Sequence, residues 1–197
     1  MENTPNKQRS GRWKLLLIIA VCASPLIASY FTYYVIKPES RTNYGSLLDP
    51  RQFPMPQLAG KNLEGKSQEL SDFKGKWIML QIDRAACESA CQKKLYDMRQ
   101  LRTAQGKERE RIERVWLITD EATPDVKLQE GIAGTRFLRV NQAALEKWLP
   151  VEAGTTVYDH IYLIDPLGNL MMRYPKDADP NKIKKDISKL LKASAIG

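Results

Sequence analysis

The fold of this chain is decided by residues 77–91, which read WIMLQIDRAACESAC. The first six residues are almost all apolar, which is typical of a short buried strand. Two cysteines, Cys87 and Cys91, follow directly, and apolar residues at helical spacing continue to Leu101. The segment therefore predicts a buried strand followed by a helix that begins with the cysteine pair.

The elements on the C-terminal side follow in a mixed order. Pro166 and Gly168 lie between two apolar runs and predict a hairpin. A helix with an apolar stripe is expected to begin at Pro180. The other expected elements are strands at 115–119, 136–140, 161–164 and 170–174 and a helix at 143–149. The order strand–helix–strand–helix–hairpin–helix predicts an α/β sandwich of the thioredoxin type.

The N-terminal region predicts a membrane anchor. Residues 15–36 form a run of 22 residues without a charged side chain, close to the ~20 needed to cross a bilayer as a helix. A cleaved signal peptide is the competing interpretation. The expected domains are a cytoplasmic N-terminus at 1–14, a transmembrane helix at 15–36, a proline-containing linker at 37–56, and a thioredoxin-like domain at 57–197.

Charge and cysteine usage indicate the compartment and exclude one class of partner. More basic residues lie close before the apolar run than after it, which favours an inside N-terminus. We therefore expect a single-pass protein of a bacterial-type inner membrane with its C-terminal domain in the periplasm, where disulfides persist. From Pro38 onward the chain has 26 basic and 22 acidic residues. This mild excess does not indicate a nucleic-acid partner.

The cysteine pair admits two kinds of chemistry. Two thiols one helical turn apart can cycle between dithiol and disulfide, or present two soft sulfur atoms to one metal ion. A helix N-terminus favours the thiolate form, and Cys87 lies closest to it. His160 is the only histidine and precedes an expected strand at the sheet edge. If it meets the cysteines, the three residues would suit copper, as Cu(I) or Cu(II).

Several motifs together resemble the Sco/SenC family. They are residues 75–77 (GKW), the Cys87-x-x-x-Cys91 pair, residues 117–124 (LITDEATP) and residues 159–168 (DHIYLIDPLG). The resemblance implies a membrane-tethered, copper-binding thioredoxin fold that assists assembly of the copper centre of cytochrome c oxidase. It implies Cys87, Cys91 and His160 as copper ligands, and the oxidase copper-site subunit or another assembly factor as partner. Glu88 and Gln92 depart from the family pattern, which has prolines there, and the interval from Cys91 to His160 is short.

The residues leave other functions open beside a copper metallochaperone. A thiol–disulfide oxidoreductase would use Cys87 and Cys91 as a redox pair and would need neither metal nor His160. A non-catalytic assembly scaffold would need none of the three, and a static disulfide would only stabilise an exported domain. A peroxidase is disfavoured because the Thr-x-x-Cys arrangement of peroxiredoxins is absent around Cys87.

Overall fold

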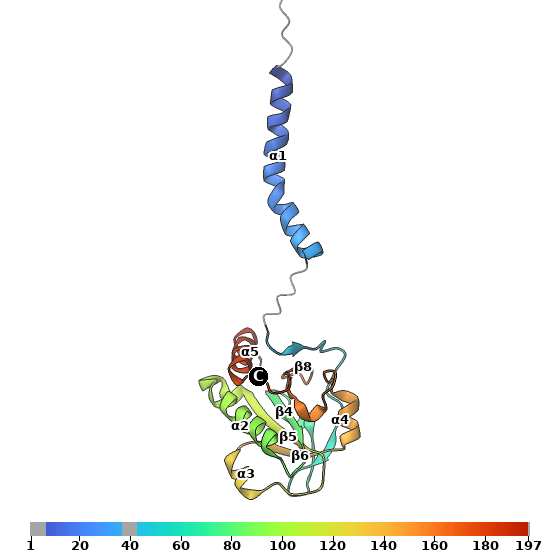
Figure 1. Cartoon of the computed structure of the whole chain (residues 1–197). Coiled ribbons are helices and arrows are strands. Elements are labelled where there is room, and N and C mark those ends of the chain that lie inside the picture. The colour runs from blue at the N-terminus through green and yellow to red at the C-terminus, as the bar shows by residue number, and fades with distance from the viewer. Residues whose placement is uncertain (1–6, 37–42, 197) are drawn as a thin grey trace, which may run out of the picture. The chain divides into compact units, whose positions relative to one another are not determined.

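The computed structural model describes residues 7–36 and 43–196 (Figure 1). The chain divides into two compact units, residues 1–42 and residues 43–197. The N-terminal unit contains helix α1 (Lys7–Phe31) and the short π-helix η1 (Thr32–Ile36). Among the described residues, one helical stretch, Gly11–Val35, is long and apolar enough to cross a membrane. It overlaps the transmembrane helix that the sequence predicts at 15–36 except for the last residue, and Cys22 is exposed on its surface.

The second unit is built on one mixed sheet of the order β1-β8-β7-β4-β5-β6-β2-β3. Its centre is β4 (Trp77–Asp83), which pairs in parallel with β5 (Ile112–Ile118) and antiparallel with β7 (Ile161–Ile164). The apolar run that predicted a buried strand is therefore the middle of the sheet. The flanking strands are β1 (Ser46–Leu47), β2 (Ala59–Lys61), β3 (Ser67–Glu69), β6 (Arg136–Arg139) and β8 (Leu170–Arg173).

Helices cover both faces of this sheet (Figure 1). Helices α2 (Ser89–Thr103) and α5 (Pro180–Ala193) share one apolar core with Met79 and Leu163. Helix α4 (Gln142–Trp148) packs on the opposite face. The other helical elements are α3 (Val126–Gly131) and the 3-10 helices η2 (Leu70–Phe73), η3 (Gly106–Arg111) and η4 (Val157–Asp159). The two-layered covering is the thioredoxin-like α/β fold expected from the sequence.

The predicted linker at 37–56 extends too far into the second unit. Its first six residues lie outside the described part of the chain, whereas residues from 43 onward belong to the second unit. Ser46 and Leu47 form β1 and pair with Arg173 and Met172 of β8. Prolines argue against long regular elements, but they leave room for a strand of two residues at the edge of a sheet.

Candidate functional site

The cysteine pair lies where β4 ends and α2 begins. Cys87 and Cys91 form a disulfide, and their Cα atoms lie 5.1 Å apart. The helix begins at Ser89 and not at Cys87, so the two sulfur atoms do not share one helical face as the sequence predicted. Cys87 belongs to the preceding turn, in which its N–H donates to the carbonyl oxygen of Arg84. This turn folds the thiol back over the first helical turn.

The backbone holds this turn in an uncommon conformation. Cys87 has a φ of 37°, and Asp177 is the other non-glycine residue of the described chain with positive φ. Both residues line the same pocket. A positive φ costs a non-glycine residue on the order of 1–3 kcal/mol, and such residues gather at functional sites. Their common position marks this pocket as the leading candidate.

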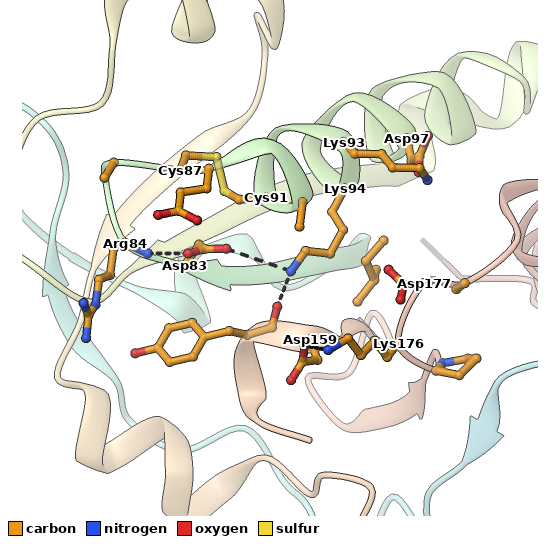
Figure 2. A pocket seen from close by; sticks show the side chains of 17 residues that line it. Asp83, Arg84, Cys87, Cys91, Lys93, Lys94, Asp97, Asp159, Lys176 and Asp177 are labelled. Atoms are coloured by element: carbon orange, nitrogen blue, oxygen red, sulfur yellow. Dashed lines mark hydrogen bonds and ion pairs between the residues drawn. A yellow bond between two sulfur atoms is a disulfide. The ribbon is translucent and has the colours of Figure 1, made fainter. Parts of the chain in front are cut away.

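The pocket has a volume of about 360 Å³ and lies beside the disulfide (Figure 2). One wall carries Cys87, Cys91 and Lys94, from the cysteine turn and α2. Another carries Asp159, which ends η4, and Lys176 follows β8. The lining contains both acidic and basic side chains, so the pocket presents charges of both signs next to the sulfur atoms.

Asp83 and Lys94 form the charged pair nearest to the cysteine turn. Lys94 Nζ lies 4.0 Å from Asp83 Oδ2, and the same ammonium group donates to the carbonyl oxygen of Tyr158 (Figure 2). Burial raises the pKa of Asp83 and lowers the pKa of Lys94, despite the attraction between them. Burial therefore opposes the charged form of each group in the wall of the pocket that holds the disulfide.

A buried amide contacts the second cysteine from beneath. The Gln81 side chain is fully buried in the middle of β4, and its Nε2 donates to Cys91 Sγ and to the Cys91 carbonyl oxygen, each at 3.2 Å. Its Oε1 is buried without a hydrogen-bond partner. Sequence reasoning did not select Gln81, although it is the one polar residue in the apolar run 77–82. That exception was the available signal.

His160 does not join the cysteines in this structure. The imidazole is fully buried, with Nδ1 2.9 Å from the Tyr174 carbonyl oxygen and Nε2 2.7 Å from the Thr155 hydroxyl. Burial lowers the pKa of His160 more than the bond to Tyr174 raises it. The lowered pKa favours the neutral form of the ring. Because a carbonyl oxygen can only accept, Nδ1 carries a proton, and Nε2 shares a hydrogen bond with the Thr155 hydroxyl.

Strand alternation explains the position of the ring. Tyr162 and Ile164, at even positions like His160, belong to the core beneath α4. Ile161 and Leu163 belong to the core shared with α2 and α5. Successive side chains of a strand point to opposite faces. His160 thus belongs to the face opposite the helix that carries Cys91, which is a correction to the expectation that imidazole and thiols meet at one edge.

The three predicted ligands therefore do not form a copper site in this structure. Both thiolates are consumed by the disulfide, and both imidazole nitrogens already have partners. Across residues 7–36 and 43–196, no group of three or more His, Cys, Asp or Glu side chains is placed to hold a metal ion. The cysteine pair is brought together as predicted, and the histidine is not.

The sequence matches two family models that agree with the two structural units. Residues 77–194 match the transmembrane-like, thioredoxin-like C-terminal domain, and residues 5–35 match the transmembrane-like N-terminal domain. The first match covers more than half of the chain. The chain belongs to this family of transmembrane-like, thioredoxin-like proteins. No curated protein sequence matches it significantly.

Solved structures with the same fold include a thiol-disulfide oxidoreductase and copper-bound Sco proteins. The thioredoxin domain of the thiol-disulfide oxidoreductase BVU-2223 from Bacteroides vulgatus has a TM-score of 0.54 at 23% identity, covering 71% of this chain and 96% of that one. Copper-bound yeast Sco1 has a TM-score of 0.58 at 16% identity, covering 73% and 91%. Copper-bound ScoI from Bradyrhizobium japonicum has a TM-score of 0.52 at 17% identity, covering 71% and 98%. These likenesses establish the thioredoxin-like fold.

Proposed function

We propose that this chain is a membrane-anchored thiol–disulfide oxidoreductase whose redox pair is Cys87 and Cys91. The observation that carries the proposal is the disulfide itself, which lines a charged pocket and is contacted by the buried Gln81 amide. His160 takes no part, because its ring is committed to Thr155 and Tyr174. The thiol–disulfide oxidoreductases among proteins of similar fold support this choice.

The reaction transfers two electrons and two protons. In the reduced protein the Cys87 thiolate attacks one sulfur of a partner disulfide, which releases the other partner sulfur as a thiolate and forms a mixed disulfide. Cys91 then attacks Cys87 Sγ, which frees the second partner thiol and closes the Cys87–Cys91 disulfide. Two thiols of this chain are oxidised, and two partner sulfurs are reduced. The protons released from the two thiols are taken up by the partner sulfurs.

The pocket supplies the groups that this exchange needs. Asp83 and Lys94 line the pocket beside the cysteine turn, 4.0 Å from each other, and we assign them the role of taking up and returning the protons. The cysteine residues are only 1% and 3% exposed. Exchange therefore requires the turn at residues 84–88 to open toward the pocket. The strained φ of Cys87 favours this, because opening relieves it.

The test is disulfide exchange by the full-length protein in detergent, in a Cys22→Ser background that removes the third cysteine. We expect the reduced protein to reduce an oxidised peptide that carries a two-cysteine copper-site sequence. Cys91→Ser should accumulate a mixed disulfide through Cys87, because the resolving thiol is missing, and Cys87→Ser should be inert. A wild-type disulfide that neither forms nor exchanges in glutathione buffer would overturn the proposal.

A second candidate is a copper metallochaperone of a divergent Sco/SenC type. Copper-bound proteins among those of similar fold favour it, and reduction would free two thiolates, which are soft ligands suited to Cu(I). In this function the client would be the copper-site subunit of cytochrome c oxidase, or another assembly factor. The domain would then work in the periplasm, with the N-terminus inside.

Copper loading separates the two candidates. The reduced Cys22→Ser protein is titrated anaerobically with Cu(I) against a competing chelator, beside Cys87→Ser and His160→Asn variants. Stoichiometric binding that depends on Cys87 supports the metallochaperone, and absence of binding removes it. Equal affinity in His160→Asn removes the three-ligand site while leaving a two-thiolate site.

A further inference from the structure

The outward face of α5 carries charge of one sign. Its exposed lysines are Lys182, Lys184, Lys185, Lys189 and Lys192. The only acidic residue within the helix, Asp186, is buried at 2% exposure. The apolar residues Ile183, Ile187 and Leu191 pack into the core with α2. The helix therefore shows solvent a cationic surface, which we call the lysine face and define by the five lysines.

The buried carboxylate attaches α5 to the start of the second unit. Asp186 Oδ2 accepts hydrogen bonds from the N–H groups of Tyr44 and Gly45, at 2.8 and 2.9 Å. The Tyr44 hydroxyl accepts from the N–H of Asp179, which caps the helix, and Lys182 Nζ lies 5.1 Å from the centre of the Tyr44 ring. The chain that arrives from the membrane helix is therefore fixed directly on α5.

The length of chain before this attachment limits how far α5 can lie from a bilayer. The stretch that is apolar enough to cross a membrane ends at Val35, nine residues before Tyr44. A fully extended chain spans at most about 3.6 Å per residue, so the two points are separated by no more than roughly 32 Å. This tether keeps the lysine face at a high effective concentration near the lipid surface.

We propose that the lysine face of α5 binds the anionic phospholipid headgroups of the membrane in which the N-terminal helix is anchored. Exposed lysines are attracted to anionic headgroups over about one Debye length, which is ~10 Å at moderate salt. An acidic protein surface would satisfy the same charges, but the tether attaches α5 to the bilayer and to no other partner. The proposal depends on the membrane anchor and is independent of the thiol chemistry.

The test is chemical footprinting of lysines in the full-length protein in nanodiscs. One nanodisc contains phosphatidylcholine alone, and the other contains phosphatidylcholine mixed with phosphatidylglycerol. Limited acetylation followed by mass spectrometry gives the modification rate of each lysine. We expect the acetylation rates of Lys184, Lys185 and Lys192 to be at least about threefold lower in the anionic nanodisc than in the neutral one. High salt should restore these rates, because it screens the attraction. Lys61 and Lys66, in the β2–β3 hairpin at the far edge of the sheet, are the matched controls and should not change.

A variant makes the test independent of local reactivity. One variant combines three substitutions, Lys184→Glu, Lys185→Glu and Lys192→Glu. In this triple variant, Lys182 should lose its lipid-dependent protection from acetylation. The control pair Lys61→Glu with Lys66→Glu should keep it. All substituted lysines are exposed, so both variants keep the packed core. Equal modification rates in the two nanodiscs, or protection that high salt does not remove, would overturn the proposal. Equal rates are also the result expected if the lysine face binds an acidic protein.

Discussion

At the scale of single residues, Gln81 determines more about the cysteine pair than its place in an apolar strand suggests. Its amide is fully buried, donates to Cys91 Sγ and leaves Oε1 without a partner in the disulfide form. Reduction frees a sulfur at Cys91, and its thiolate would accept from the same Nε2 in a charge-assisted hydrogen bond, which is stronger than a bond to a disulfide sulfur. A hydrogen bond to a charged group contributes about 1.5–3 kcal/mol, so Gln81 favours the reduced state.

Gln81→Leu is therefore expected to stabilise the disulfide. The dithiol–disulfide equilibrium constant against glutathione should shift about tenfold toward the disulfide, which corresponds to a reduction potential about 30 mV lower. The measurement is the fraction of reduced protein across a series of glutathione buffers. Gln68→Leu, on the remote strand β3, is the control and should leave the potential unchanged. An unchanged or raised potential in Gln81→Leu would show that the amide has no such role.

His160 is expected to act on stability and not on redox chemistry. His160→Asn loses one of two buried hydrogen bonds, so the free energy of unfolding should fall by about 1–3 kcal/mol. Denaturant unfolding of the oxidised protein measures this loss. The reduction potential of the cysteine pair should stay within error of the wild-type value, because the ring belongs to the opposite face of the sheet. A large shift in potential would contradict the position that we assign to it.

The two predicted chemical features thus had different outcomes. Cys87 and Cys91 are close in sequence, so their meeting depends only on local geometry, and it could be predicted. His160 meets the two cysteines only if its side chain points to the face of the sheet on which they lie. Residues 161–164 are all apolar and buried, so the sequence does not indicate which face of the sheet His160 joins, and a shift of one residue exchanges the two faces.

At the scale of elements, η4 forms the part of the pocket wall that precedes His160. Thr156 and Asp159 cap this short helix reciprocally, and Asp159 Oδ1 also lies 3.1 Å from Lys176 Nζ. Burial raises the pKa of Asp159, but the hydrogen bonds from Thr156 and Lys176 outweigh it and hold the value at about 2. The carboxylate therefore stabilises the folded state fully above its ordinary pKa of 3.8, and this contribution is lost as the pH falls through about 2.

Asp159→Ala should lower the free energy of unfolding at pH 7 by about 1 kcal/mol. The difference between the variant and the wild type should shrink as the pH falls from about 4 toward 2, because the wild-type carboxylate then becomes protonated. Urea unfolding at a series of pH values measures the difference. A destabilisation that stays constant down to pH 2 would show that the charge of Asp159 contributes nothing. Lys176→Met is the companion variant. It removes one cause of the low pKa of Asp159, so the stabilisation by this carboxylate should be lost over a narrower pH range.

The long elements were predictable and the short ones were not. Strand β4 and helix α5 were predictable because a run of six residues with five apolar members, or apolar residues at helical spacing, is a strong signal. Strands β1, β2 and β3 have two or three residues each, too few for any periodicity. They form through pairing with strands that are distant in sequence. For the same reason a proline-containing segment was taken as linker up to residue 56.

At the scale of the whole molecule, one apolar helix and one thioredoxin-like unit account for the two family matches. The anchor prediction can be tested by charge placement. Val21→Lys with Leu26→Lys places two lysines near the middle of the apolar stretch, and each costs about 3 kcal/mol at that depth. We expect the variant to be released from membranes by alkaline carbonate, whereas the wild type is retained. Leu15→Lys, near the end of the stretch, is the control and should be retained because the side chain can reach the interface. Retention of the double variant would contradict a transmembrane role for α1.

The account depends most on the claim that Cys87 and Cys91 exchange with a partner disulfide without help from His160. The most direct measurement is the initial rate at which the reduced full-length Cys22→Ser protein reduces an oxidised two-cysteine peptide. We compare this protein with its Cys87→Ser and His160→Asn variants. We predict a rate in His160→Asn within about twofold of the parent, which is less than 1 kcal/mol in the barrier, and no reaction in Cys87→Ser. A parent protein that is inert, or a His160→Asn variant as inactive as Cys87→Ser, would contradict it.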